Sequence, residues 1–137
     1  MLARIVSTVL GFSLLIAGCS TTRNEFEVAP ELLTASGTAK VSKLNSQNLS
    51  VAVEVKNLAK PEKAQPGAAV YVLWMQPTDA VGAPPQNLGA FNVDKNYYAE
   101  LDATTTHSKF DLFVTAEPNG QSIGPSGKRL MWTRVER

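Results

Sequence analysis

The stretch Leu49-Ser50-Val51-Ala52-Val53-Glu54-Val55-Lys56 places leucine or valine at every second position, with Ser50, Ala52, Glu54 and Lys56 between them. A period of two is that of a β-strand with one face against an apolar core and the other face in water. The apolar set is leucine and valine, which pack well on a pleated sheet. The alternation therefore predicts a half-buried strand over residues 49–58.

Six further stretches predict strands, because each is short, rich in apolar or β-branched residues and bounded by turn formers. They are residues 38–44, 68–75, 87–93, 97–103, 110–117 and 128–135. Residues 38–44 suit an edge strand. Residues 68–75 are apolar on both faces, so they predict a central strand with Trp74 as the core anchor.

The segments between these strands carry residues that interrupt regular structure. Residues 59–67 contain two prolines and residues 77–86 contain three, and each proline removes a backbone hydrogen-bond donor. Asp94-Lys95-Asn96 predicts a tight turn that closes a hairpin, with Asn96 at positive φ. Residues 118–127 predict a long turn.

Seven short strands separated by turns in about 100 residues predict an all-β fold. We expect an immunoglobulin-like antiparallel β-sandwich of about seven strands over residues 36–137. Ahead of it, residues 20–35 are polar, contain Pro30 and show no period, so residues 19–35 are predicted to form a flexible tether.

The amino-terminal residues have the outline of a signal peptide. Arg4 is followed by thirteen uncharged residues, 5–17, which are too few for a transmembrane helix. The run ends in Leu15-Ile16-Ala17-Gly18-Cys19, which resembles the lipobox of bacterial lipoproteins. The resemblance implies cleavage between Gly18 and Cys19, acylation of Cys19, and attachment to a membrane through the acyl chains.

The residue after the cysteine, Ser20, bears on location. In lipoproteins of two-membrane bacteria an aspartate there favours the inner membrane, so the resemblance implies the outer membrane, facing the periplasm. An ordinary secretory signal beside an incidental cysteine is the alternative, although a lone exposed thiol in an exported protein would be a reactive liability.

Composition and charge exclude some functions. Without residues 1–18 the chain has 137 minus 18, or 119, residues, enough for one domain. It then carries 12 of the 13 Lys and Arg residues and all 12 acidic residues, so its net charge is zero. No basic field favours nucleic acid. Lys56, Lys60 and Lys63 form a loose group that is typical of a solvated loop.

Three ordered stretches carry a resemblance to a known family. They are Tyr71-Val72-Leu73-Trp74-Met75, Asn87-Leu88-Gly89-Ala90-Phe91 and Thr115-Ala116-Glu117-Pro118-Asn119-Gly120. Their order and spacing resemble the extracytoplasmic C-terminal domain of RskA-type anti-sigma-K factors, over about residues 51–135, and imply a β-sandwich. Such factors have a cytoplasmic helical segment and a transmembrane helix ahead of this domain. Here a signal peptide and a tether are predicted instead, so no contact with a sigma factor is expected.

The sequence offers few residues for chemistry. His107 is the single histidine, so an imidazole cluster cannot form. With Met75 and Met131 it could make a soft copper site, and otherwise the three are a loop histidine and two packed thioethers. Gly120-Gln121-Ser122-Ile123-Gly124 has the Gly-x-Ser-x-Gly spacing, but it lies in the predicted long turn and no helix is predicted after it, so it does not predict a nucleophile elbow. We predict no catalytic residue, no bound metal and no cofactor, and therefore no enzyme activity.

Four residues are candidates for an interaction surface. Glu117 begins a Glu-Pro-Asn-Gly turn, where it could accept hydrogen bonds from the long loop or contact a ligand. Tyr97, Tyr98 and Trp132 lie on outer strands, where an aromatic side chain faces either water or the core.

These features predict a membrane-anchored envelope lipoprotein whose sandwich is a non-catalytic binding or interaction module, with sensing as one form of that role. Its expected partners are the membrane, through acyl chains on Cys19, and an envelope protein. The alternative is a periplasmic carrier of a small ligand or metal. A third reading is an enzyme whose partner supplies the missing residues.

Overall fold

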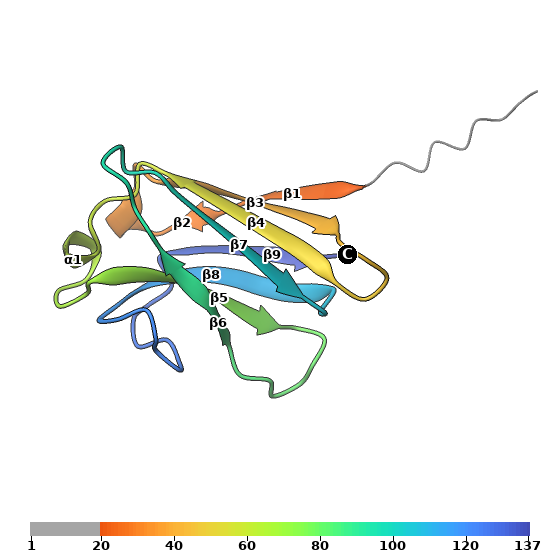
Figure 1. The fold of residues 1–137 in the computed structure, drawn as a ribbon. Coiled ribbons are helices and arrows are strands. Elements are labelled where there is room, and N and C mark those ends of the chain that lie inside the picture. Colours follow the sequence, from red (N-terminus) through yellow and green to blue (C-terminus); the bar gives the residue numbers. More distant parts are fainter. Residues whose placement is uncertain (1–19) are drawn as a thin grey trace, which may run out of the picture.

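Two antiparallel β-sheets pack face to face in the computed structural model, which describes residues 20–137 (Figure 1). The predicted signal peptide, the cleavage site at Gly18 and the acylation site at Cys19 lie outside the described residues. The described strands are β1 Thr21–Glu25, β2 Glu27–Val28, β3 Ser36–Lys43, β4 Leu49–Lys56, β5 Val70–Pro77, β6 Gln86–Phe91, β7 Ala99–Thr105, β8 Lys109–Glu117 and β9 Met131–Glu136.

The first sheet has the strand order β1-β3-β4-β7, and the second has the order β2-β9-β8-β5-β6. From β3 onward, the chain order and the pairing match the immunoglobulin strands A, B, C, C′, E, F and G, with A, B and E in one sheet and C′, C, F and G in the other. The prediction of an all-β, immunoglobulin-like sandwich is confirmed. The seven predicted strands are β3 to β9, and β1 and β2 are additional.

The core lies between the sheets and follows the alternation seen in the sequence. Val51, Val53 and Val55 of β4 are buried, whereas Ala52 and Glu54 point outward and are half-buried. On the facing sheet, β5 and β8 contribute larger side chains. The inward residues of these two strands are Tyr71, Leu73, Met75, Phe110, Leu112, Val114 and Ala116.

The predicted tether is wrong for residues 20–35, because this segment is part of the sandwich. β1 pairs with β3, and the chain then crosses at Phe26 so that β2 pairs with β9 of the other sheet. The 3-10 helix η1, Pro30–Leu32, follows, and the side chains of Phe26 and Leu32 are in the core. Because β1 already pairs with it, β3 is not the edge strand that was predicted.

The segment gave no strand signal because β1 is polar on both sides. Its inward side faces the seam between the two sheets rather than the apolar core. There the Asn24 side-chain amide donates a hydrogen bond to the Arg134 carbonyl of β9 at 3.0 Å. A polar side chain that links β1 to β9 therefore stands where a period of two would require an apolar residue.

The connection between β6 and β7 is also not the predicted hairpin. The two strands belong to different sheets, so residues 92–98 cross from one sheet to the other. The residue with positive φ in this crossing is Tyr97, at 60°, and not Asn96. Asp94 shapes the turn, since its carboxylate accepts hydrogen bonds from the amides of Asn96 at 2.7 Å and Tyr98 at 3.0 Å.

Trp74 is fully buried, but it does not lie in the central core. It forms a second cluster with Val72 and Phe113 on the outer face of the five-stranded sheet. The Arg129 guanidinium lies 4.0 Å above the Phe113 ring. The Asn87 amide of β6 donates to the carbonyls of Gly120 and Ser122. The predicted long turn therefore folds back over this face and covers Trp74.

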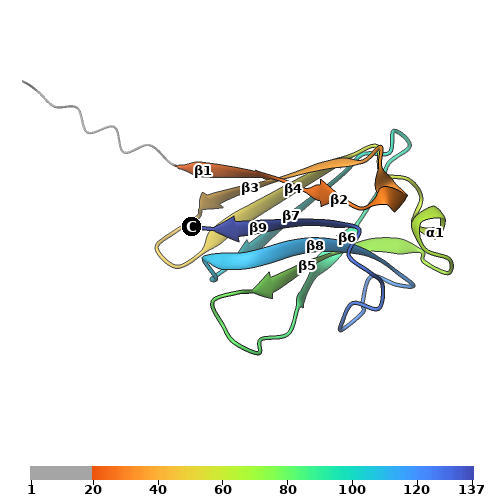
Figure 2. The same cartoon turned by 180° about the vertical axis from the view of Figure 1, so that it is seen from behind.

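The sandwich has two ends, which we name by the chain segments found there (Figure 2). The entry end is where Ser20 leads into β1, and it also holds the loops at residues 44–48, 78–85 and 106–108, together with Arg137. The far end holds η1, residues 57–69, residues 92–98 and residues 118–130. Within residues 57–69 the short helix α1, Pro61–Ala64, occupies part of a stretch predicted to be irregular.

Tyr71 ties the segment that carries α1 to the core. Its hydroxyl donates to the Ala59 carbonyl at 2.7 Å, and burial raises the pKa of the phenol to about 12 from the ordinary 10.0. Because the folded-state pKa is the higher one, this contribution to stability is complete below pH 10 and is lost as the pH rises toward 12.

We therefore expect Tyr71→Phe to lower the free energy of unfolding by about 1 kcal/mol near neutral pH. The unfolding free energy of the variant should also fall less between pH 9 and pH 11, because the variant has no phenol to ionise at position 71. Urea titrations of both proteins at pH 7, 9 and 11 measure this. An equal alkaline slope in the two proteins would contradict the role given to the phenol.

Candidate binding surfaces

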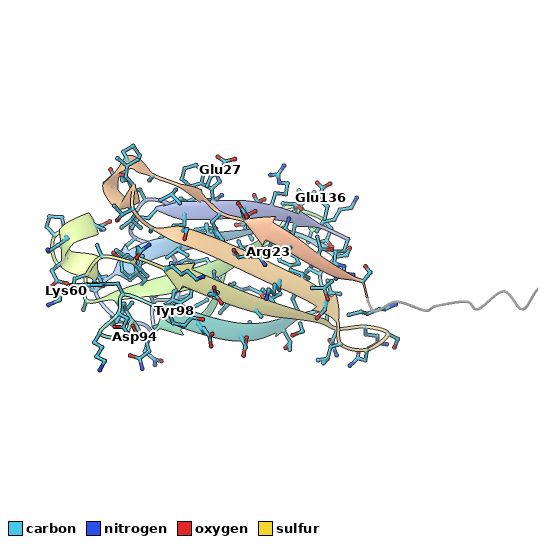
Figure 3. All side chains as sticks on the ribbon, turned by 90° about the horizontal axis from the view of Figure 1, so that it is seen from above. Arg23, Glu27, Lys60, Asp94, Tyr98 and Glu136 are labelled. Atoms are coloured by element: carbon cyan, nitrogen blue, oxygen red, sulfur yellow. The ribbon has the colours of Figure 1, made fainter. Side chains whose placement is uncertain are left out.

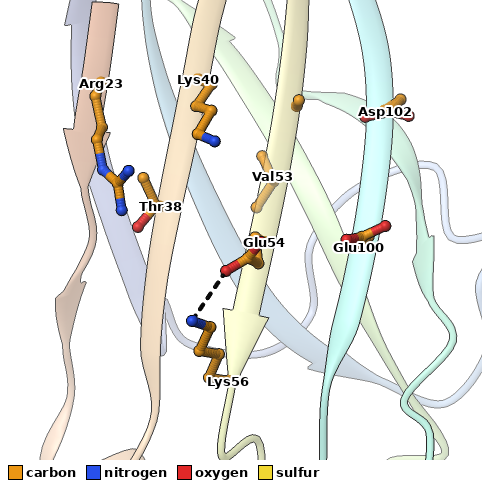
Figure 4. A pocket seen from close by; sticks show the side chains of 9 residues that line it. Arg23, Thr38, Lys40, Val53, Glu54, Lys56, Glu100 and Asp102 are labelled. Carbon is orange, nitrogen blue, oxygen red and sulfur yellow. Dashed lines mark ion pairs between the residues drawn. The ribbon is translucent and has the colours of Figure 1, made fainter.

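The outward side of the four-stranded sheet carries an open depression of about 420 Å³ (Figure 4). We call this side of β1, β3, β4 and β7 the polar face. The depression is lined by Arg23, Thr38, Lys40, Ala52, Val53, Glu54, Lys56, Glu100 and Asp102. Apart from Ala52 and Val53, all of these side chains are polar or charged.

The depression arises from the register of the strands. Arg23 of β1 lies opposite Lys40 of β3, Lys40 lies opposite Ala52 of β4, and Ala52 lies opposite Asp102 of β7. Cross-strand neighbours on one face have Cβ atoms about 5 Å apart. The short Ala52 side chain therefore leaves a hollow between two long basic side chains and an acidic one.

Charge is divided across the polar face. Figure 4 shows Arg23 and Lys40 on the β1 and β3 side, and Glu100 and Asp102 on β7. Between the two groups, the Glu54 carboxylate pairs with the Lys56 ammonium at 3.3 Å. A partner with the complementary division of charge would be oriented by this face.

Tyr98 lies at the acidic edge of the polar face. Its hydroxyl lies between two carboxylates, 3.1 Å from Glu54 and also within hydrogen-bonding distance of Glu100, and its single proton can be donated to either. The bond to Glu100, followed by desolvation and the bond to Glu54, raises the pKa of Tyr98. The same phenol, followed by Lys56, lowers the pKa of Glu54. The tyrosine thus stays a neutral donor between two carboxylates.

A second hollow, of about 500 Å³, lies at the far end. It is lined by Thr34, Asn57, Ala59, Lys60, Lys63 and Tyr97. Figure 3 shows Lys60 at this end, with Asp94 and Tyr98 on the neighbouring loop. Two exposed ammonium groups beside a tyrosine ring can hold an anionic group by charge and an apolar one by contact.

The structure does not bring the predicted surface residues together. Tyr97 is 50% exposed and borders the far-end hollow, and Tyr98 is half-buried next to the polar face. Trp132 is half-buried on β9 of the other sheet, where its indole N–H donates to Glu27 at 3.0 Å. Tyr97 and Tyr98 therefore remain candidates for one interaction surface, and Trp132 lies on a different part of the molecule.

Glu117 is wrong as a surface residue, because it is completely buried. Its carboxylate accepts hydrogen bonds from the Thr115 hydroxyl at 2.6 Å, from the Ser126 hydroxyl, and from the amides of Ser126 at 2.9 Å and Gly127 at 3.3 Å. Burial alone would raise the pKa of Glu117, but these hydrogen bonds outweigh burial and lower it. The carboxylate holds the long loop and is not available to a ligand.

The structure does not bring together the three residues considered for a copper site. Met75 and Met131 are buried in the core, whereas the His107 imidazole pairs with the Asp79 carboxylate at 3.0 Å at the entry end. Within residues 20–137, no three His, Cys, Asp or Glu side chains are grouped to hold a metal ion. Neither helix in that range has the length and apolar character needed to cross a membrane.

Sequence reasoning missed the residues that make the polar face. Lys40, Ala52 and Asp102 stand on predicted strands, and their outward direction follows from the alternation, but their adjacency requires the pairing of β4 with β7. Arg23 stands in the segment predicted as a tether. The available signal was the alternation in residues 49–56, which puts Ser50, Ala52, Glu54 and Lys56 on the side away from the core.

The backbone of Tyr97 yields a prediction, because left-handed conformation costs a residue with a side chain about 1 to 2 kcal/mol. Its amide donates to Asp94 at 3.1 Å and its carbonyl accepts from Leu58 at 3.0 Å, so the conformation is fixed by two backbone hydrogen bonds. We expect Tyr97→Gly to raise the free energy of unfolding by about 1 kcal/mol, measured by urea denaturation. A decrease would show that the exposed ring contributes more packing than the backbone costs.

A scan of the sequence against models of protein families finds no match, and a search of curated proteins finds no matching relative.

Proposed function

We propose that this protein is a lipid-anchored, non-catalytic binding module of the bacterial cell envelope. The observation that carries the proposal is the junction between the lipobox and the folded body. The first strand begins at Thr21, two residues after the lipobox cysteine, and the described core lies between Phe26 and Val135. An apolar segment that ends at Gly18-Cys19 immediately before a folded domain is suited to export and acylation.

The anchor is tested by mass spectrometry of the amino-terminal peptide from protein purified out of the membrane. We expect a mature chain that begins at Cys19 and carries acyl groups, and a Cys19→Ser variant that is neither acylated nor retained in the membrane fraction. Ser20→Ala is the matched control, since it should be acylated like the unchanged protein. An unmodified Cys19 with residues 1–18 still attached would refute the anchor.

Position in the envelope is tested at Ser20. The resemblance to lipoboxes implies the outer membrane, facing the periplasm, because aspartate after the cysteine favours the inner membrane in that family and Ser20 stands there instead. Ser20→Asp should therefore move the protein from the outer to the inner membrane fraction on a sucrose gradient. No change in distribution would contradict the sorting inferred from Ser20.

The binding role is supported by the polar face, whose basic and acidic halves flank the hollow at Ala52. The partner we propose is an envelope protein with complementary charge. A photoreactive amino acid at position 52 should form a discrete crosslinked product in intact cells, and Lys40→Glu should remove it. The same group at Ala69, which is exposed at the far end just ahead of β5, is the control. Crosslinks that are equal at both positions, or unaffected by Lys40→Glu, would count against this face.

The alternative, a carrier of a small ligand, is favoured by the far-end hollow with Lys60, Lys63 and Tyr97. Its chemistry suits an anion rather than a soft metal, because both candidate thioethers are buried in the core. Calorimetry with inorganic phosphate and with citrate tests it. Stoichiometric heat that is lost in a Lys60→Ala, Lys63→Ala variant would support a carrier, and absence of heat would leave the protein-binding role.

A further inference from the structure

The folded body begins immediately after the acylation site proposed above, on which this inference rests. β1 starts at Thr21, which pairs with Ser42 of β3. Ser20 itself is held, because the Arg137 guanidinium donates to the Ser20 carbonyl and, at 3.0 Å, to its hydroxyl. The same guanidinium donates to the Val41 carbonyl of β3. The carboxy-terminal residue thus fixes Ser20 to the end of the sandwich.

This arrangement removes the freedom that a tether would give. Consecutive Cα atoms are 3.8 Å apart, so Cys19 lies one residue away from a chain position that is hydrogen-bonded to the domain. Acyl chains on Cys19 would enter the bilayer beside the entry end. A flexible linker of about fifteen residues would allow the domain every orientation relative to the membrane. An acylated residue bonded directly to the fixed Ser20 allows the domain only a few.

Hydrogen bonds join Arg137, which holds Ser20, to the neighbouring loops of the entry end. The Arg137 amide donates to the Ser108 carbonyl at 2.9 Å, and the Thr78 amide donates to the Lys109 carbonyl at 3.0 Å. These bonds join the carboxy terminus, residues 106–108 and the start of residues 78–85 into one surface. In Figure 2 this end carries the chain into β1, and α1 lies at the opposite end.

The side chains of this surface suit a lipid headgroup region. Leu44 is 58% exposed and begins the loop at residues 44–48, and Val81 is fully exposed within the loop at residues 78–85. Lys43 and Lys109 are also exposed. Among the acidic groups here, Asp79 is paired with His107. Peripheral proteins bind a membrane surface with exposed apolar side chains flanked by lysines. The apolar groups enter the headgroup region to a depth of about 5 to 10 Å, and the ammonium groups lie near the lipid phosphates.

We propose that the entry end is a membrane-contact surface, on which the sandwich stands directly against the bilayer with Leu44 and Val81 in the headgroup region. The far-end hollow and the loop crossing at Tyr97 then point away from the membrane, and the polar face stands roughly upright. The lipid anchor accordingly sets the orientation of the domain as well as its location.

The test uses the fact that the chain has a single cysteine, which acylation blocks. A second cysteine is then the one free thiol for an environment-sensitive fluorophore. Val81→Cys and Leu44→Cys report on the entry end, and two exposed positions away from it are matched controls, Leu33→Cys at the far end and Ile123→Cys on the loop that covers Trp74. The acylated protein is reconstituted in vesicles of phosphatidylethanolamine and phosphatidylglycerol.

We expect labels at positions 81 and 44 to be blue-shifted and severalfold less accessible to aqueous iodide than labels at positions 123 and 33. Insertion of about ten Gly and Ser residues between Ser20 and Thr21, which adds roughly 17 Å of root-mean-square reach, should abolish the difference while the protein still floats with vesicles.

The outcomes separate this inference from the anchor. Protein that floats with the vesicles but shows equal iodide access at both ends overturns the contact surface and leaves the anchor standing. Protein that does not float, and whose Cys19 is unmodified by mass, overturns both.

Discussion

Glu117→Gln is expected to lower the free energy of unfolding by about 3 kcal/mol, because a buried carboxylate that accepts several hydrogen bonds is replaced by an amide that can accept only at one atom. The Oε1 atom of Glu117 alone receives bonds from the Thr115 hydroxyl and from the amides of Ser126 and Gly127. The amide NH2 group of glutamine would face the Ser126 hydroxyl at the other position. The measurement is urea denaturation at neutral pH, and Glu136→Gln, at an exposed position of β9, is the control that should change stability little.

The pH dependence gives an independent check. The pKa of Glu117 is lowered in the folded protein, so its contribution is complete above the ordinary value of 4.5 and is lost as the pH falls through the folded-state pKa. The difference in unfolding free energy between the two proteins should therefore shrink on acidification below that value. A constant difference down to the pH of acid unfolding would contradict a charged Glu117.

The same substitution should loosen the loop that covers Trp74. The indole N–H donates to the Thr115 hydroxyl at 2.8 Å, and that hydroxyl donates to Glu117. In a Trp132→Phe background Trp74 is the single tryptophan, since the chain has two. We expect Glu117→Gln to increase acrylamide quenching of Trp74, whereas an unchanged rate would mean that the loop stays in place without the carboxylate.

The sequence was sufficient to predict the position of a strand wherever one face of that strand packs against the core. The alternation in β4 gave the strand, its inward residues and its solvated face, because burial on one side forces a period of two. The same logic located β3 and β5 to β9, each within a few residues of its observed bounds. Strand position is local information, and it could be read from local pattern.

The pairing of strands was not local, and this is where prediction failed. Asn87 to Phe91 and the strand after Asp94 are consecutive, and consecutive strands commonly form hairpins, yet β6 and β7 are in separate sheets. Trp74 shows the same limit, because a strand buried on both faces does not reveal which face meets the other sheet. The polar face could not be predicted for this reason, since it joins β1, β3, β4 and β7.

A substitution of each leucine in Leu32-Leu33 decides whether the amino-terminal segment is a tether or part of the fold. Leu32 is 2% exposed and belongs to the core, whereas its neighbour Leu33 is 80% exposed. Leu32→Ala should lower the free energy of unfolding by about 3 kcal/mol, through lost transfer free energy and the cavity that remains. Leu33→Ala should change it by less than about 0.5 kcal/mol, as surface substitutions do.

The pair is a close control, because the two variants share composition, neighbours and effect on the unfolded chain. A flexible tether would make both substitutions neutral. Loss of stability in Leu32→Ala alone would establish that the chain is folded within a dozen residues of Ser20. The orientation proposed at the entry end requires this result, because it needs a folded segment, and not a flexible one, next to the anchor at Cys19. Equal and negligible effects would restore the tether and remove the basis for that orientation.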